Sequence, residues 1–300
     1  MNFASVEKVA AAILYEGYIL YPYRPSAIKN RQRWNFGTLY PRVYAEARRP
    51  QEPFRLVAEC LVVENGQAAL DIKVSFLQLV PQAKVNPEDI HNLSDPSLDW
   101  DEAVERTAEF SGVSVGELVA APKILDVRPA AELRAGLSLR AELLASGAEA
   151  RRDQALPLSL VSTHLVLGVA DGEFVSLLEP AERYSADAKG CVNTGVFPVL
   201  AGEAPDRSMM LVSPIIMYDY PQTAPESKGD FFDGTEMDEM LTLRVLTLTD
   251  AEKEEMRMGD PRARRILERT EALTGEQMME AHGVIRQLRE LRPGGLEETR

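Results

Sequence analysis

Two periods of apolar residues run along this chain, and each predicts a different kind of element. Over residues 5–20 the apolar positions recur at helical spacing, which predicts a short amphipathic helix with Ser5 as its N-cap. From residue 54 the period shortens to two, as in the run from Leu70 to Phe76. Strict alternation is typical of a strand that buries one face. The pattern therefore predicts a helix first and a sheet after it.

Two dipeptides, Asn65-Gly66 and Asp171-Gly172, are turn signals of the kind that join antiparallel strands. Each lies between two strand-like runs, so we predict two β-hairpins. The paired runs are residues 54–63 with 70–76, and residues 160–169 with 173–178. Alternation and apolar content predict further strands at residues 131–144, 196–200, 209–216 and 241–248.

Helix signals lie between and after these strands. Residues 99–112 are predicted to form a short helix that ends near Gly112, and residues 181–190 are predicted to form another. Residues 81–98 are polar and contain proline, which predicts a loop. The helices predicted near the carboxyl end are one over 251–258 capped by Thr249-Asp250, one that starts at Asp260-Pro261, and one over 274–291.

Strands and helices do not alternate regularly, which disfavours a doubly wound nucleotide-binding fold. The predicted class is α+β, with a mainly antiparallel β centre, a helical C-terminal segment and an irregular N-terminal arm rich in tyrosine and arginine. We predict a β-rich unit over residues 1–248 that includes the arm, a helical segment over 249–292, and a disordered tail over 293–300.

Composition and charge narrow the class of partner. The 300 residues carry a formal net charge of -14, which repels phosphate backbones and anionic lipid surfaces. We therefore predict no nucleic-acid partner and no membrane association. The first residues lack the pattern of a secretion signal, and two cysteines far apart in sequence indicate no disulfide framework. These features predict a cytoplasmic protein with reduced thiols.

Common catalytic fingerprints are missing from the sequence. There is no glycine-rich motif for binding a dinucleotide, no P-loop and no serine nucleophile elbow. There is also no helical zinc-protease motif and no pair of cysteines with two residues between them. No catalytic residue is therefore assigned, and a non-enzymatic role is favoured over an enzymatic one.

Carboxylates cluster between residues 230 and 239, around the turn Gly234-Thr235. Several oxygen ligands on one turn suit a hard divalent cation such as Mg²⁺ or Ca²⁺, although the spacing differs from that of an EF-hand. The alternative is a solvated turn that leads into a helix, where acidic residues complement the helix dipole. The residues concerned are Asp230, Asp233, Glu236, Asp238 and Glu239.

One histidine and one cysteine are further candidates. His164 lies in a predicted strand beside Thr163, where it could act as a general base or a metal ligand, or could be a buried histidine bonded to the backbone. Cys191 follows Lys189, and a nearby ammonium lowers the pKa of a thiol, as a nucleophile needs; the alternative is a small apolar residue in a packed site. Cys60 is predicted to lie in the core.

Tyrosine and arginine are concentrated near the amino terminus, where six of the nine tyrosines precede residue 45. These residue types are enriched at binding hot spots, because they bury area and keep a polar group. The predicted partner-binding residues are Tyr21, Tyr23, Arg24, Arg31, Arg33 and Trp34, with Tyr218 and Tyr220 in a second tyrosine-rich segment. The alternative is that the arm packs on the protein's own sheet by cation–π contacts and hydrogen bonds.

The second tyrosine-rich segment, residues 213–221, leads into the acidic run. Opposite charges and shared aromatic residues predict that it docks on the N-terminal arm. In that arrangement Arg24 or Arg33 would pair with a carboxylate of Asp219, Glu226 or Asp230.

Two stretches of the sequence resemble an uncharacterised bacterial protein family associated with gene clusters of uptake nickel–iron hydrogenases and their maturation factors. The matching runs are residues 14–18, 21–26 and 30–34 in the first stretch, and 218–222, 224–227, 233–236 and 241–244 in the second. The resemblance implies a cytoplasmic accessory role in hydrogenase assembly, as a scaffold or chaperone. It supplies no catalytic residues.

Two hypotheses of function follow. The first is a non-enzymatic accessory protein that binds another protein, with a hydrogenase subunit or maturation factor as the partner and the arm as the contact surface. No cofactor is predicted for this role. The second is a metal-dependent enzyme or metal carrier in which His164 and the carboxylates Asp230, Asp233 and Glu236 hold a divalent ion, with Cys191 as a lesser candidate.

Overall fold

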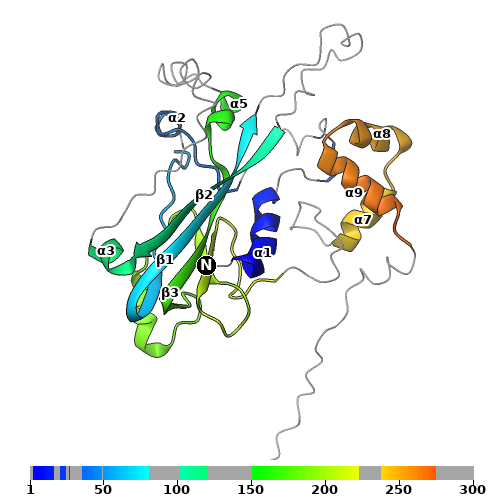
Figure 1. Cartoon of the computed structure of the whole chain (residues 1–300). Helices are drawn as coiled ribbons and strands as arrows, with labels where there is room; N and C mark the ends of the chain where they lie inside the picture. The colour runs from blue at the N-terminus through cyan, green and yellow to red at the C-terminus, as the bar shows by residue number, and fades with distance from the viewer. Residues whose placement is uncertain are drawn as a thin grey trace, which may run out of the picture.

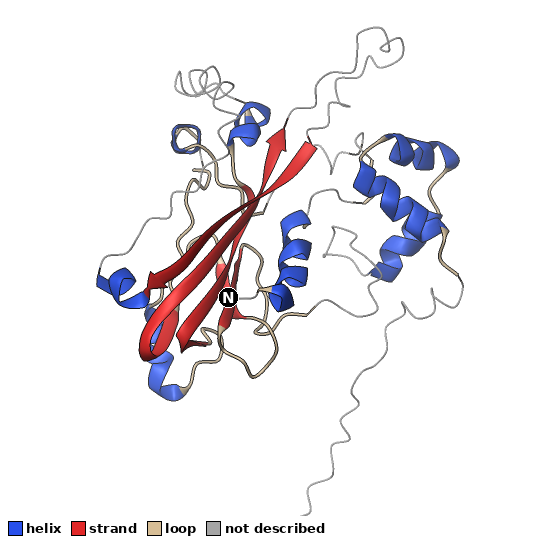
Figure 2. Ribbon diagram, viewed as in Figure 1, coloured by secondary structure: helices blue, strands red, loops and turns tan. Residues whose placement is uncertain are grey.

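The computed structural model describes residues 3–16, 21–24, 27, 36–48, 50–80, 102–120, 151–222 and 238–274. A five-stranded sheet in the order β2-β1-β3-β5-β4 forms its centre, and every neighbouring pair of strands is antiparallel. The strands are β1 (Leu61–Val80), β2 (Glu102–Ser114), β3 (Val161–Val175), β4 (Phe197–Leu200) and β5 (Met209–Ser213). Helices lie beside this sheet, so the predicted α+β class is confirmed (Figures 1 and 2).

Short helices surround the sheet, and three more follow it in the chain. The described helices are α1 (Ala4–Tyr15), α2 (Arg42–Glu46), α3 (Val115–Ala120), α5 (Arg152–Ala155), α6 (Ser185–Gly190), α7 (Asp238–Leu246), α8 (Asp250–Met258) and α9 (Pro261–Glu271). Two 3-10 turns, η5 (Leu156–Leu158) and η6 (Glu182–Tyr184), extend α5 and precede α6. Turn η6 and α6 together confirm the helix predicted at residues 181–190. Helix α1 lies between the sheet and the group α7–α9 (Figure 1).

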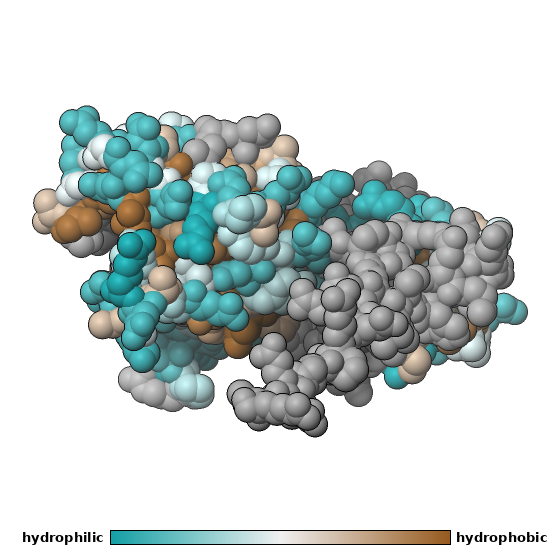
Figure 3. Space-filling view, turned by 90° about the horizontal axis from the view of Figure 1, so that it is seen from below, coloured by the Kyte–Doolittle hydropathy of each residue, from teal (hydrophilic) through white to brown (hydrophobic). Residues whose placement is uncertain are grey.

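The two faces of the sheet bury different side chains because successive residues of a strand point to opposite sides. On one face, Ile72 and Val74 of β1 pack in a cluster with Leu165 and Leu167 of β3 and Val212 of β5. Figure 3 views the molecule from below and shows that the outer surface around this core is mixed, with separate apolar spots among polar residues.

Helix α1 covers the other face of the sheet. Its residues Val6, Ala10 and Ile13 are spaced by four and three positions, so they share one side of the helix. That side packs against Val166 of β3 and Leu211 of β5, the strand residues that alternate with those of the first cluster. The amphipathic helix predicted from spacing is thus present, and its apolar side is the side that packs on the sheet.

The N-cap predicted for this helix is wrong. Helix α1 begins at Ala4 after Phe3, which makes no side-chain cap bond. Ser5 lies inside the first turn, and its hydroxyl points to the sulfur of Met209 at 4.0 Å. Packing of the helix on the sheet, and not a local capping bond, sets where it begins.

Neither predicted hairpin forms. Strand β1 runs through Asn65-Gly66 and strand β3 runs through Asp171-Gly172, and the two strands pair with each other on both sides of these turn signals. The register between them shifts between Glu64 and Ala69. Strand pairing depends on packing against cross-strand neighbours over the whole sheet, so the local turn signals did not decide the partners.

The turn signal in β3 nevertheless marks a sharp bend. Asp171 adopts a left-handed backbone with φ 52°. On either side of it, the amide of Val169 donates to the carbonyl of Ser208 and the amide of Phe174 donates to the carbonyl of the preceding residue, Arg207. Because both bonds end on neighbouring residues, strand β3 bends between Val169 and Phe174. Val169 and Phe174, on the two sides of the bend, belong to the same core cluster, and both sides pair with β1.

Two predicted element types are also wrong. Of the residues predicted as a helix at 99–112, those from Glu102 onward form strand β2 along β1, in which Glu105, Thr107 and Glu109 are exposed and the alternating residues are half-buried. Residues predicted as a strand at 241–248 belong largely to helix α7. There Leu241 and Val245 are fully buried, four positions apart, which is a helical period that the short apolar run concealed.

The predicted cap of α8 and the predicted start of α9 are confirmed. The Thr249 hydroxyl accepts from the amide of Glu252, and the Glu252 carboxylate accepts from the amide of Thr249, which is a capping box at the start of α8. The Asp260 carboxylate accepts from the amide of Arg262 at 2.7 Å, and Pro261 occupies the first turn of α9. These bonds are local, so sequence spacing alone predicts them.

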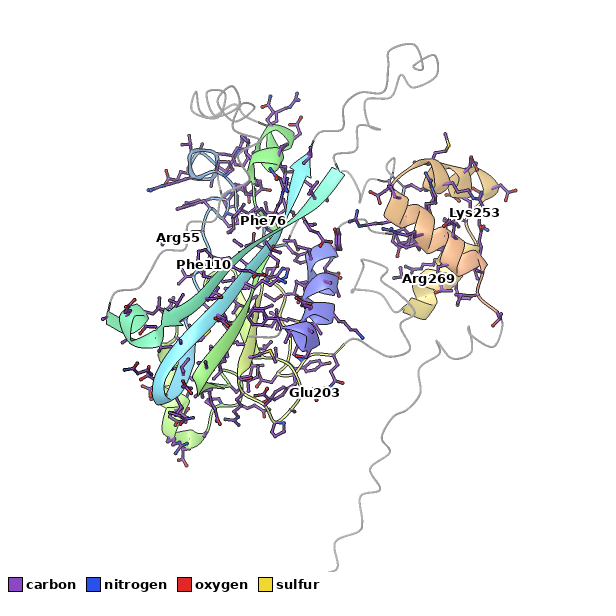
Figure 4. The ribbon with its side chains drawn as sticks, in the orientation of Figure 1. Arg55, Phe76, Phe110, Glu203, Lys253 and Arg269 are labelled. Carbon is purple, nitrogen blue, oxygen red and sulfur yellow. The ribbon has the colours of Figure 1, made fainter. Side chains whose placement is uncertain are left out.

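The C-terminal helices share a core cluster with the sheet. Leu241, Met256 and Leu267 belong to the same group of buried residues as Tyr15 of α1 and Leu79 of β1. Figure 4 shows the side chains of these helices, including Lys253 and Arg269, as a group set apart from those around Phe76 and Phe110 on the sheet. The division at residue 248 stays a prediction. The loop at 81–98, the strand at 131–144, the helix at 274–291 and the tail at 293–300 lie outside the described residues.

Candidate functional site

The segment that follows β5 carries two large exposed apolar side chains. Ile216 is 74% exposed and Tyr218 is 64% exposed. Between and before them, Ile215 and Met217 pack against the cluster under α1. The alternation of strand β5 therefore continues past Ser213, with one set of side chains in the core and the other in solvent. We call residues 213–220 the outer segment.

Hydrogen bonds hold the outer segment at both ends. At its start Ser213 pairs with Phe197 of β4 in the sheet, and its hydroxyl accepts from the amide of Ile215 at 2.9 Å. At its end the amide of Tyr220 donates to the carbonyl of Leu200 at 2.7 Å, beside edge strand β4. The exposed side chains are thus carried by backbone that is fixed on each side of them.

Asp219 is the centre of a polar network behind the outer segment. One carboxylate oxygen accepts from the amide of Leu200 at 2.8 Å, and the other accepts from the Ser176 hydroxyl at 2.6 Å. The Ser176 oxygen in turn accepts from the amides of Leu178 and Glu179. Bonds to an ionised carboxylate are stronger than neutral ones. The network therefore ties three separate parts of the chain together at this point.

Backbone strain also marks the outer segment. Tyr220 has φ 56°, a left-handed conformation that non-glycine residues rarely adopt. At the other end, a Cβ added at Gly37 would lie 2.7 Å from Cγ of Pro214, so only glycine allows this close approach. Strained conformations persist where surrounding contacts determine them, and they gather at binding sites and other functional sites.

The described part of the N-terminal arm packs against the C-terminal helices. Tyr23 is fully buried, and its ring meets that of Tyr21 edge to face with centroids 6.1 Å apart. The Arg244 guanidinium of α7 lies 5.5 Å from the centroid of the Tyr21 ring. For these residues the contacts are those of the self-packing alternative. Arg31, Arg33 and Trp34 lie outside the described residues.

Arg24 pairs with helix α8. Its guanidinium lies 3.0 Å from the carboxylate of Glu252 and 3.4 Å from that of Glu255. Asp219, which was predicted to pair with the arm, is instead bonded to Ser176 and Leu200. The predicted Arg24–Asp219 contact is therefore wrong, because the capped start of α8 offers nearer carboxylates. The alternative partners Glu226 and Asp230 lie outside the described residues.

Tyr15 joins three elements. Its hydroxyl donates to the Glu105 carboxylate of β2 at 2.6 Å and accepts from the Arg262 guanidinium of α9. That guanidinium also lies 4.1 Å from the centroid of the Tyr15 ring. Burial, and then the bond to Glu105, raises the pKa of the Tyr15 hydroxyl. The residue is thus a neutral structural bridge and not an acid–base group.

His164 lies in β3 and is buried. Its Nδ1 is 3.1 Å from the carbonyl of Ser162, so it satisfies the alternative of a histidine bonded to the backbone. Burial lowers the pKa of the imidazole, against a smaller opposing effect of that bond, and Lys73 lowers it further. The neutral imidazole of His164 is therefore a packed side chain of the core.

Metal binding by His164 stays a prediction. Among the described residues no group of three or more histidine, cysteine, aspartate or glutamate side chains could hold an ion. Asp230, Asp233 and Glu236, the carboxylates proposed to complete the site, lie outside the described residues. Elemental analysis of protein purified without chelator is the measurement that decides this question.

We expect His164 to make stability depend on pH. Burial holds the pKa of folded His164 below the ordinary histidine value of 6.5, so the unfolded chain binds a proton first as pH falls. The free energy of unfolding should therefore decrease below about pH 6.5, by up to about 1.4 kcal/mol per pH unit, until the folded pKa is reached. Urea unfolding of the wild type and of His164→Gln at several pH values measures this. Equal slopes for the two proteins would contradict it.

Cys191 does not have the lowered pKa that its sequence context predicts. Burial raises the pKa of its thiol, and the carboxylates of Glu59 and Asp187 raise it further. Burial also raises the pKa of the Cys60 thiol to about 12, with smaller effects from Cys191 and Glu59. Lys189, the residue that suggested activation, is exposed. Neither thiol has the character of an activated nucleophile.

Tyr218 and Tyr220, both predicted to bind a partner, differ in exposure. Tyr218 is the exposed member, whereas Tyr220 is half-buried and packs against the cluster that contains Leu200. Ile216 and the anchoring role of Asp219 were not predicted from the sequence. The available signal was the apolar run Ile215-Ile216-Met217, which continues the alternation of the strand before it.

Comparisons of this chain with protein-family models, with curated proteins and with solved structures found no match. The resemblance to a hydrogenase-associated family therefore stays a prediction. Within the part of the chain that the structure describes, no helix is both long and apolar enough to cross a membrane.

Proposed function

We propose that this chain is a non-enzymatic accessory protein that binds another protein through its outer segment. The observation that supports this most strongly is the exposure of Ile216 and Tyr218 on backbone anchored at both ends. A surface whose conformation is set before binding loses less conformational entropy on association than a mobile one. Such a surface suits recognition more than it suits chemistry.

The residue types also favour binding. Tyrosine is among the residues enriched at interface hot spots, because its ring buries a large area while its hydroxyl keeps a hydrogen bond. Ile216 adds apolar area two positions away, on the same side of the alternating backbone. Of the acid–base and thiol candidates in the described residues, His164 is buried and bonded to a backbone carbonyl. Burial raises the pKa of the Cys191 thiol, so it is not an activated nucleophile.

For the partner we propose a subunit or a maturation factor of a nickel–iron hydrogenase. This part of the proposal is supported only by the resemblance of residues 14–34 and 218–244 to the hydrogenase-associated family. The second of these stretches begins at Tyr218, so it includes part of the outer segment. A hydrogenase-producing extract is therefore the first in which to look for the partner.

We expect the double variant Ile216→Ser/Tyr218→Ala to lose its partner. Removing a hot-spot side chain typically weakens binding by about 2 kcal/mol, which is more than tenfold. The measurement is affinity capture from a native extract of hydrogenase-producing cells, followed by titration of the captured partner. Because both side chains are exposed, the melting temperature should change little.

A matched control is Val119→Ser, which removes an apolar side chain that is 79% exposed on α3. It should retain the partner at wild-type affinity. Equal capture by the wild type, the control and the double variant would contradict a role for the outer segment. Recovery of the wild type alone would contradict the accessory function itself.

A further inference from the structure

The two cysteines of this chain lie opposite each other. Val57 and Thr194 form an antiparallel bridge in which each amide donates to the other's carbonyl, at 3.2 and 2.9 Å. In an antiparallel register one residue number rises as the other falls. Three positions beyond the bridge, Cys60 therefore faces Cys191.

Side-chain bonds continue this register beyond the bridge. The Glu59 amide donates to the Asn193 side-chain oxygen at 2.9 Å, and the Asn193 amide group donates back to the Glu59 carbonyl at 3.3 Å. The amide of Val192 donates to the Glu59 carboxylate at 2.7 Å. These bonds reach the residues next to both cysteines, so the two segments stay together up to the thiols.

The position of the pair suits a disulfide. Hydrogen-bonded and non-hydrogen-bonded pairs alternate along an antiparallel ladder, so the third pair after Val57–Thr194 is of the non-hydrogen-bonded kind. Its Cα atoms lie about 4.5 Å apart in a regular ladder, and disulfides accept about 4.4 to 6.8 Å. The Val57–Thr194 bridge is isolated, and beyond it the Asn193 side chain takes the place of backbone groups in bonding Glu59. Both sulfurs are thiols in the structure.

We propose that Cys60 and Cys191 form a reversible disulfide with each other when the folded protein meets a low-molecular-weight disulfide oxidant. Cys191 reacts first: its thiolate attacks oxidised glutathione, a mixed disulfide forms and one glutathione thiolate leaves. The Cys60 thiolate then attacks the Cys191 sulfur and releases the second glutathione. Two protein thiols are oxidised, one glutathione disulfide is reduced to two thiols, and the protons pass to the released glutathione.

Two features of the site shape this reaction. The thiol pKa values are raised, so few thiolates are present near neutral pH and the reaction speeds up as pH rises. A low thiol pKa stabilises the reduced form of a pair, so raised values favour the disulfide once it has formed. The bond would join the chain before β1 to the connection between α6 and β4.

The test treats the full chain with oxidised glutathione at mildly alkaline pH, then blocks remaining thiols and digests the protein. We expect one peptide pair linked between Cys60 and Cys191, and a protein that remains monomeric on a non-reducing gel. The Cys60→Ser variant should stop at the mixed disulfide on Cys191. The proposal would be overturned if both cysteines of the wild type stayed reduced and were therefore modified by the blocking reagent. Disulfide-linked dimers would also overturn it.

The melting temperature provides a second, independent readout. A disulfide that closes a long loop in unstrained geometry should raise the melting temperature of the oxidised chain by about 5 °C over the reduced chain. The Cys191→Ser variant treated in the same way should show no rise. An oxidised wild type that melts below the reduced protein would show that the bond does not fit the native structure.

Discussion

Replacing Leu267 by alanine is expected to destabilise the protein by about 3 kcal/mol. Leu267 lies on α9 and has no exposed surface, so the substitution leaves a cavity that the packed neighbours only partly fill. The expected loss is a large fraction of the stability of an ordinary domain. It should appear as a lower midpoint in equilibrium unfolding by urea.

The Leu267→Ala variant also tests whether the C-terminal helices unfold with the sheet. Leu267 shares its buried cluster with Tyr15 of α1 and Leu79 of β1, and Arg262 on the same helix binds the Tyr15 hydroxyl. We therefore expect far-UV circular dichroism and hydrogen exchange of β1 to shift together. A β1 that keeps its wild-type protection would contradict this coupling and favour a separate helical unit.

Arg265→Ala is the matched control for this substitution. Arg265 lies on the same helix, two positions earlier, and its side chain is exposed. Its removal should change the free energy of unfolding by no more than about 0.5 kcal/mol. A large loss in this control would indicate a change in the helix itself and not in the core.

Replacing Asp219 by alanine is expected to cost about 2 to 3 kcal/mol and to remove partner binding. The substitution takes away the acceptor of the Leu200 amide and of the Ser176 hydroxyl. Leu200 is buried, so its amide would be left without a partner and would carry the full cost of desolvation. Loss of the network also releases the backbone that carries Tyr218.

Two further variants separate the causes in this second prediction. Asp219→Asn keeps an oxygen for the Leu200 amide, so it should lose roughly half as much stability, about 1 kcal/mol. Asp187→Ala removes an exposed aspartate of α6 and should leave both stability and binding unchanged. Thermal unfolding and partner capture are measured on all three. An Asp219→Ala protein as stable as the wild type would contradict the anchoring role.

Elements decided by neighbours in sequence are the ones that sequence patterns predicted well. The capping box of Thr249 with Glu252 and the cap of Asp260 on α9 depend on residues two or three positions apart. The apolar side of α1 was likewise visible in its spacing. These features need no knowledge of the rest of the chain, and the α+β class follows from them and from the alternating runs.

Strand partners are a different matter, because they are chosen over long distances in sequence. Both turn signals, Asn65-Gly66 and Asp171-Gly172, are present, yet β1 and β3 pair with each other across about a hundred residues. The same reason explains the short apolar run at Leu241. A helix and a strand of that length have similar patterns, and only packing on α9 selects the helix.

For the candidate site, the sequence by itself determined the residue types and the alternation that carries them: a tyrosine-rich, proline-bounded run after an apolar strand. Tyr23 and Tyr218 both lie in tyrosine-rich runs bounded by prolines, so the residue types alone do not separate them. Only the tertiary structure separates them, because the C-terminal helices bury Tyr23, while the Asp219 network holds Tyr218 in solvent. Exposure depends on what packs against a side chain, and those contacts come from distant parts of the chain.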